Sequence, residues 1–273
     1  MAYSSDTSSG ARHDRNLLLH GSKRNEVLTL AEVRQYGADS FGDPDYIRIY
    51  GATPPDWYGR GVRLLGRTAV ECTRDELADR IGRDIAEIVA RSLAPLNCAV
   101  IDPFAGSCNT LFWILRHLPN AQGLAFELDS VVHGLTERNL ALMGAGIDLH
   151  RGDYQSLLPN LDIASETCIV AFIAPPWGKA LDEAKGLDLR ATIPPITEII
   201  KFFDRTFLAR KMLFAVQVYE KVDPASLSDV QALVDWSELR VYAFNAERKN
   251  HGLLLATKGW RSQATKDRFA SPH

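Results

Sequence analysis

The chain has 273 residues, of which 46% are hydrophobic and 24% charged, and its formal net charge is −3. These values are typical of a globular protein with one large domain and room for a smaller appendage. No apolar run approaches the ~20 residues that cross a bilayer, so we expect no membrane partner. The slightly acidic balance weighs against a long nucleic-acid partner, because phosphates select a basic face.

The four cysteines predict neither a metal site nor a disulfide framework. Cys72, Cys98, Cys108 and Cys168 form no C-x-x-C pair and show no metal-ligand spacing. The polar N-terminus lacks the continuous apolar core of a secretion signal. We therefore expect reduced thiols, no bound metal and a cytoplasmic protein. The oligomeric state does not follow from the sequence.

Residues 1–65 are predicted to form an N-terminal cap of irregular pattern, because Asp-Pro and Pro-Pro dipeptides mark tight turns near its end. Amphipathic aromatic residues gather there, among them Tyr50, Trp57 and Tyr58. One interpretation is that the cap packs over a core and buries these rings. The other is that the cap is a lid whose rings form walls of a substrate pocket, which makes the three residues candidates for substrate binding.

Residues 66–262 are predicted to form the main domain, in which buried strands alternate with helices. Helical patterns cover 73–93, 109–118, 131–145 and 195–209. Strand-like apolar runs cover 98–104, 123–129, 148–153, 168–174 and 211–219. This alternation predicts a doubly wound, mostly parallel α/β sheet that is covered by helices on both faces.

The stretch 238–259 breaks this rhythm with two strands that are joined directly around 245–251. A hairpin there makes one strand antiparallel and brings the predicted sheet to seven strands. His251 is expected to be a residue of this hairpin rather than a catalyst. Residues 263–273 are expected to form a polar tail.

The first predicted strand ends at Asp102 and runs into a turn of small residues in the stretch VIDPFAGSCNT. Small residues let the backbone approach a ligand, and the helix start that follows offers free N–H groups. The stretch lacks both the G-x-G-x-x-G fingerprint and the lysine of a P-loop, which argues against a bound pyrophosphate. The candidate cofactor-binding residues here are Asp102, Phe104, Gly106, Asn109 and Thr110.

Acidic residues also end the next two predicted strands. Glu127 in GLAFELD stands where a carboxylate can accept from both hydroxyls of a ribose, with Asp129 as the alternative. Asp153 in HRGDYQSL could accept from an adenine amino group. Each acid alone could equally cap a helix. Three in succession, with a glycine turn after the first, indicate an adenosine that is held without phosphates.

The fourth of these strands ends in the stretch FIAPPWGKAL. Two prolines after a strand could simply end it, because proline lacks the ladder donor and restricts its predecessor. Alternatively, Pro175 and Pro176 fix a rigid turn that presents Trp177 as a wall for a flat substrate. We take Pro175, Pro176 and Trp177 as the candidate catalytic residues, Trp177 also as a substrate contact, and Ala174 as a further candidate for cofactor binding.

These stretches resemble the class I S-adenosylmethionine-dependent methyltransferases, and more narrowly the RNA cap guanine-N2 methyltransferases, the trimethylguanosine synthase family. The similarity covers roughly residues 60–205. VIDPFAGSCNT is like V-D-x-F-x-G-x-G-G-N-T, AFELD is like A-I-D-I-D, and APPWGKALDEAKGLDLRA follows S-P-P-W-G-G-x-x-Y with its later F-D-I-R. The resemblance implies a Rossmann-like class I fold, S-adenosyl-L-methionine as cofactor, a ribose role for Glu127, an adenine contact for Asp153 and stacking of Trp177 on the base to be methylated.

Two departures from the family pattern bear on the acceptor. Arg74 stands where the family usually has proline, and Ala174 stands where amine-methylating relatives carry Asp, Asn or Ser. Alanine cannot accept a hydrogen bond from the attacking nitrogen. Either a backbone carbonyl serves, or the nucleophile is a ring carbon or ring nitrogen and a base lies elsewhere. The sequence does not choose a base among Tyr50, Tyr58, His20 and Glu26.

Charge favours a small, flat heteroaromatic acceptor, for example an indole-type metabolite in a biosynthetic reaction. A capped RNA would need cations for its triphosphate, which Lys179 and Arg190 could supply, but acidic residues lie among them. RNA cap or nucleotide guanine-N2 methylation is the alternative. A third interpretation is a catalytically silent methyltransferase fold that serves as a binding protein.

Overall fold

The computed structural model describes residues 14–91, 97–243 and 251–260. The chain divides into two compact units, Met1–Glu71 and Cys72–His273. The predicted polar tail at 263–273 and the hairpin turn before His251 lie outside the described residues. In the described ranges, no helix combines the length and the apolar character needed to cross a membrane.

The first unit is helical. It contains α1 (Arg15–Leu19), α2 (Leu30–Phe41), α3 (Pro54–Gly59) and α4 (Gly66–Glu71). The irregular sequence pattern of this part had led to no prediction of helices. A capping box begins α2: the backbone N–H of Glu32 donates to Thr29 Oγ1 at 3.3 Å, and the Glu32 carboxylate accepts from the backbone N–H of Thr29 at 2.8 Å. This T-x-x-E pattern is a sequence signal for a helix start.

The second unit is built on a seven-stranded sheet with the order β3-β2-β1-β4-β7-β9-β8. Neighbouring strands are parallel except for β9, which is antiparallel to both β7 and β8. This arrangement confirms the predicted doubly wound, mostly parallel sheet with an antiparallel hairpin. The strands are β1 (Cys98–Asp102), β2 (Gln122–Glu127), β3 (Ile147–Arg151), β4 (Cys168–Ile173), β7 (Met212–Tyr219), β8 (Trp236–Tyr242) and β9 (His251–Lys258).

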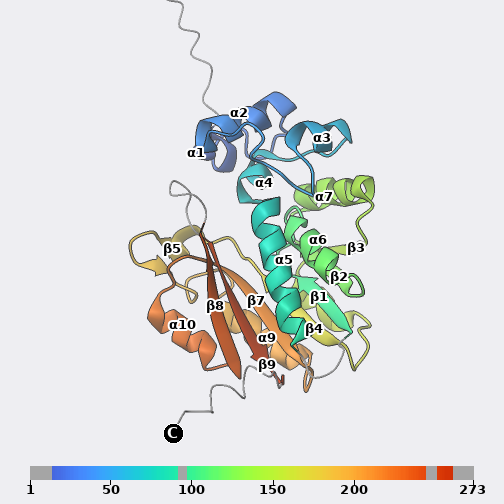
Figure 1. Ribbon diagram of the computed structural model, residues 1–273, viewed down its shortest axis with the longest axis vertical. Coiled ribbons are helices and arrows are strands. Elements are labelled where there is room, and N and C mark those ends of the chain that lie inside the picture. The colour runs from blue at the N-terminus through green and yellow to red at the C-terminus, as the bar shows by residue number, and fades with distance from the viewer. Residues whose placement is uncertain (1–13, 92–96, 244–250, 261–273) are drawn as a thin grey trace, which may run out of the picture. The chain divides into compact units, whose positions relative to one another are not determined.

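Helices cover both faces of this sheet (Figure 1). On one face, α9 buries Ile199 and Phe203 in a core cluster with Phe214 of β7. On the other, α5 and α6 pack against each other, with Ile81 and Leu111 fully buried. The helices of this unit are α5 (Asp75–Ala90), α6 (Asn109–His117), α7 (Ser130–Met143), α8 (Tyr154–Leu157), α9 (Ile196–Thr206) and α10 (Pro224–Gln231).

The strand order reverses between β1 and β4. After β1 the chain builds β2 and β3 on one side, and it then returns to place β4 on the other side of β1. Ligands of open α/β sheets bind at such a reversal, outside the carboxyl ends of the strands. The β4 side continues into a small hairpin of β5 (Leu181–Asp182) and β6 (Gly186–Leu187).

The capping box generates a prediction for the first unit. Thr29→Ala removes the hydroxyl that accepts from Glu32 N–H, and it should lower the free energy of unfolding by about 1 kcal/mol, the usual cost of losing an N-cap. Urea unfolding measures the change. Thr29→Ser keeps the hydroxyl and should remain close to the wild type; equal losses in both variants would show that the cap is not the cause.

Candidate functional site

The turn after β1 is a rigid loop with one open side. The buried Asp102 carboxylate accepts from the backbone N–H of Phe104 at 3.0 Å, and Thr136 donates its hydroxyl to the Gly106 carbonyl at 2.7 Å. Gly106 has φ +50°, and a Cβ there would meet no atom within 4 Å. A ligand can therefore approach the Gly106 backbone directly. Cys108, which replaces a small residue of the family pattern, also adopts a left-handed conformation, with φ +57°.

Glu127 ties this turn to the end of β2. One carboxylate oxygen accepts from the backbone N–H of Gly106 at 3.0 Å, and the other accepts from the backbone N–H of Asp129 at 2.8 Å. The side chain is half-buried, and a carboxylate has lone pairs for about four hydrogen bonds. Glu127 is thus held in one orientation while it keeps accepting capacity for a ligand.

The two carboxylates make the turn electronegative. The pKa of Asp102 is raised to about 7, chiefly by burial and also by the negative charge of Glu127, against the N–H of Phe104, which lowers it. Burial and the same two carboxylates hold the pKa of the Cys108 thiol well above its usual value. A cationic ligand at this turn would relieve the repulsion between the carboxylates.

Other predicted cofactor residues are engaged in structural contacts. Asn109 donates its side-chain amide to the Thr73 carbonyl at 2.8 Å and to Asp75 at 3.1 Å, which joins the starts of α6 and α5. Thr110 is buried. The exposed Asp153 accepts from the backbone N–H of Gln155 at 3.0 Å and so caps α8. The adenine role of Asp153 stays a prediction.

The turn after β4 presents an aromatic ring at the same edge of the sheet. Ala174 is half-buried, Pro175 is buried and Pro176 is exposed. The half-buried Trp177 packs on the core, with its ring centroid 6.3 Å from that of Tyr219 and 5.8 Å from that of His251. The Pro-Pro-Trp turn therefore lies beside the last residue of β7 and the first residue of β9.

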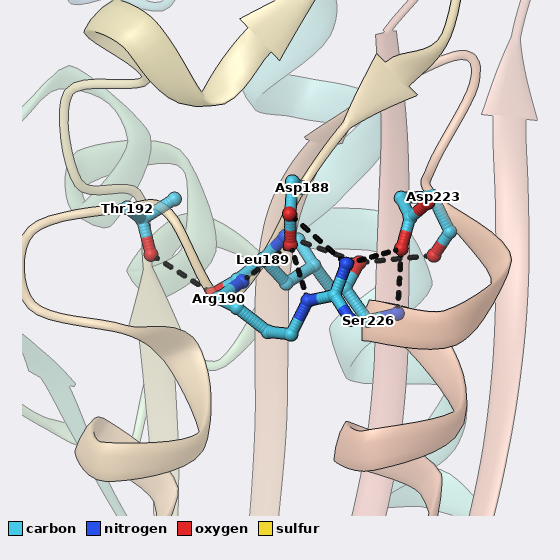
Figure 2. Close-up of polar contacts among 6 residues, drawn as sticks. All are labelled: Asp188, Leu189, Arg190, Thr192, Asp223 and Ser226. Atoms are coloured by element: carbon cyan, nitrogen blue, oxygen red, sulfur yellow. Dashed lines mark hydrogen bonds and ion pairs between the residues drawn. The ribbon is translucent and has the colours of Figure 1, made fainter.

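The D-L-R segment that follows is fixed by its own polar network (Figure 2). Arg190 donates to both carboxylate oxygens of Asp188 at 2.9 and 3.0 Å, and to Asp223 at 3.0 Å. Between them, the backbone N–H of Leu189 donates to the Ser226 hydroxyl at 3.1 Å. Arg190 therefore joins the segment after the Pro-Pro-Trp turn to the start of α10, and its charge is shared by two carboxylates.

The predicted substrate residues of the first unit lie in or beside its core. Trp57 is fully buried and donates its indole N–H to the Ile47 carbonyl at 2.9 Å. Tyr50 is buried, and the half-buried Tyr58 carries the Arg63 guanidinium 3.6 Å from its ring centroid. These positions agree with packing in the core of the unit. A substrate role for the three residues stays a prediction.

Two features of this edge did not emerge from the sequence: the exposed Leu128 and the surroundings of His251. Leu128, directly after Glu127, is a large apolar side chain that is 75% exposed at the carboxyl edge. An apolar residue between two acids in the ELD stretch was the available signal. His251 indeed begins the hairpin strand β9, but the contact of its ring with Trp177 depends on strand pairing that the local sequence does not reveal.

Comparisons with known proteins find likeness only in structure. No protein-family model matches the chain, and no curated protein matches it. The precorrin-6y C5,15-methyltransferase of Geobacter metallireducens GS-15 is similar over 69% of this chain and 90% of its own, with 14% identity and TM-score 0.44. The putative methyltransferase yhhF of Escherichia coli is similar over 69% of this chain and 88% of its own, with 17% identity and TM-score 0.41. The human methyltransferase 10 domain containing protein is similar over 69% of this chain and 85% of its own, with 13% identity and TM-score 0.46.

All three neighbours are named as methyltransferases. At such identities and TM-scores the likeness carries no argument about activity or substrate. The function is therefore argued below from this chain's own residues.

The buried Asp102 generates a prediction of pH-dependent stability. Its pKa is raised in the fold, so its contribution to stability is full below the unfolded value of about 3.8 and is lost as pH rises through about 7. Asp102→Asn stays neutral and keeps an oxygen for the N–H of Phe104. As the pH rises from about 4 to about 8, the free energy of unfolding of the variant should increase by a few kcal/mol relative to that of the wild type. Urea unfolding at several pH values tests this, and parallel curves would contradict it.

Proposed function

We propose that the protein is an S-adenosylmethionine-dependent methyltransferase that acts on a planar heteroaromatic small molecule. One observation carries the proposal: the Gly106–Glu127 hydrogen bond and the Pro-Pro-Trp turn lie at the carboxyl ends of β1, β2 and β4, around the reversal of strand order. The turn after β1 offers the Glu127 carboxylate and the open backbone of Gly106. The turn after β4 offers the flat apolar ring of Trp177. The proposal includes a cytoplasmic, biosynthetic role.

The turn after β1 fits the cofactor. S-adenosylmethionine carries a sulfonium and an ammonium group, and the paired carboxylates Asp102 and Glu127 favour positive charge. The open side of Gly106 admits the methionine part close to the backbone, while Glu127 accepts from the ribose hydroxyls. The exposed Leu128, directly after Glu127, offers apolar surface for one face of the adenine. When bound, the cofactor supplies an electrophilic methyl group on sulfur.

The chain's own task in such a displacement is to position the acceptor and to exclude water. Trp177 offers a ring face for stacking, and the prolines before it limit the conformations of its backbone. The hydrogen bond from Ala180 N–H to the Trp177 carbonyl, at 2.8 Å, holds the other end of the turn. The backbone of Trp177 is thus restrained by the prolines that precede it and by the hydrogen bond from Ala180 that follows it.

The charges near this turn support an uncharged acceptor over a capped RNA. Arg190, one of the two cations predicted for a triphosphate, is paired with Asp188 and Asp223. Lys179 is exposed, and it is followed in the chain by Asp182 and Glu183. A triphosphate would have to compete with these carboxylates for Arg190. Guanine-N2 methylation of a cap or nucleotide therefore remains the alternative.

A methyl-transfer assay tests the proposal. The purified protein receives S-adenosylmethionine with a labelled methyl group and two separate acceptor pools: RNA with capped transcripts, and a panel of indoles, purines and aryl amines. We expect label in a small heteroaromatic compound. Label in the RNA alone would replace the proposal with its alternative, and a protein that neither binds the cofactor nor transfers the methyl group would exclude an enzyme.

Loss of the Glu127 carboxylate should weaken cofactor binding. Glu127→Ala removes a charge-assisted acceptor and the anchor of Gly106, so we expect a loss of roughly 1–3 kcal/mol in the binding free energy of S-adenosylmethionine by calorimetry. Glu198→Ala is the matched control, because Glu198 is an α9 residue whose carboxylate pairs with exposed Lys201. Unchanged affinity in Glu127→Ala would remove Glu127 from the site.

Trp177 should matter to the acceptor and not to the cofactor. Trp177→Ala removes the stacking face, so turnover of the acceptor found above should fall roughly two- to thirteen-fold, on the scale of aromatic contacts. Calorimetric affinity for S-adenosylmethionine should be retained. Trp177→Phe keeps a flat ring and should recover part of the turnover. A parallel loss of cofactor affinity would instead identify Trp177 as a residue needed for folding.

A further inference from the structure

Three aromatic side chains from three separate parts of the chain meet at the carboxyl edge of the sheet. Tyr219 is the last residue of β7, and His251, the first of β9, is its partner in the antiparallel register. Because β9 runs in the opposite direction to β7, its first residue lies at the edge where β4 and β7 end. Trp177 contacts both rings, at centroid distances of 6.3 and 5.8 Å.

The His251 imidazole is neutral and incompletely bonded. Burial and the positive charge of Arg74 lower the pKa of His251 to about 4. A neutral imidazole has one ring nitrogen that accepts a hydrogen bond. Within residues 14–91, 97–243 and 251–260, no group bonds to Nδ1 of His251, although this atom is shielded from solvent. Such atoms are costly, and they call for an explanation such as a ligand or a catalytic role.

Among the described residues, Ala174, Tyr219 and Arg74 do not offer a neutral base beside Trp177 and His251. Ala174, at the end of β4, has no polar side chain. The Tyr219 hydroxyl has its pKa raised by burial and by the neighbouring Glu220, so it stays protonated at neutral pH. The Arg74 guanidinium is a donor only. A planar ring that stacks on Trp177 would thus find a neutral base in His251, whose ring contacts Trp177.

We propose that His251 accepts the ring N–H, or exocyclic N–H, of the heteroaromatic acceptor stacked on Trp177, and that it receives this proton during methyl transfer. His251 thereby supplies the acceptor that Ala174 lacks. The inference rests on the proposed methyltransferase function and narrows its substrate class to planar heteroaromatics that carry an N–H group.

The proposed step balances in atoms and charge. An electron pair of the acceptor, from its nitrogen or from a conjugated ring carbon, forms the bond to the methyl carbon. The sulfur–methyl bond breaks, and its electrons stay on the sulfur, which becomes a neutral thioether. The methylated ring is then cationic, and its N–H bond releases the proton to His251. A weak base suffices, because this cation is a strong acid; the imidazolium then returns the proton to solvent.

A binding experiment separates the inference from the proposed function. Calorimetry first measures S-adenosylhomocysteine, and failure of this ligand to bind counts against the proposed function alone. Ligand-observed NMR then measures indole and 1-methylindole, two rings that differ at the N–H, with the full chain and S-adenosylhomocysteine present. The wild type should bind indole roughly five- to fifty-fold more tightly, on the scale of a hydrogen bond to a buried acceptor.

Two variants assign this preference to His251. His251→Leu removes the acceptor and should bind the two rings equally, whereas His251→Gln keeps an amide oxygen and should retain part of the preference. Thermal melting confirms that each variant folds. The inference is overturned if the wild type binds both rings equally, if it binds neither, or if folded His251→Leu keeps the full preference for indole.

Discussion

The hydrogen bond between the backbone of Gly106 and the Glu127 carboxylate is the interaction on which the candidate site depends. It joins the turn after the central strand β1 to the end of β2, and it fixes the orientation of the carboxylate. The bond is charge-assisted and partly shielded from water, which strengthens it. A second bond joins the turn to β2: the backbone N–H of Ala105 donates to the Phe126 carbonyl at 3.0 Å.

This constraint explains why the turn tolerates two costly features. Cys108 adopts a left-handed backbone that usually favours glycine, and Asp102 is a nearly fully buried carboxylate next to a second one. A left-handed residue other than glycine costs about 1–2 kcal/mol. Strain and unfavourable burial commonly persist at functional sites, where the surrounding structure fixes them. The position of both features at the reversal of strand order fits this pattern.

The sheet was predictable from the sequence because its central strands β1, β4 and β7 are buried on both faces, and runs such as CIVAFI are typical of that environment. The turn after β1 and Glu127 were predictable because strand ends are local features. The helix α2 was missed although its T-x-x-E start was visible, and α10 was missed because its polar sequence hides the cap at Asp223 and the proline that follows. The surroundings of Trp177 were not predictable, because they depend on the register between β7 and β9.

The reversed direction of β9 has a consequence for engineering. The carboxylate turn is built by β1 and β2, whereas the ring cluster is built by β4, β7 and β9, on the other side of the reversal. Tyr219 and His251 are adjacent in space but far apart in the chain, and neither contributes to the turn that contains Gly106. A combinatorial library at these two positions can therefore vary the ring cluster while the carboxylate turn keeps its wild-type sequence.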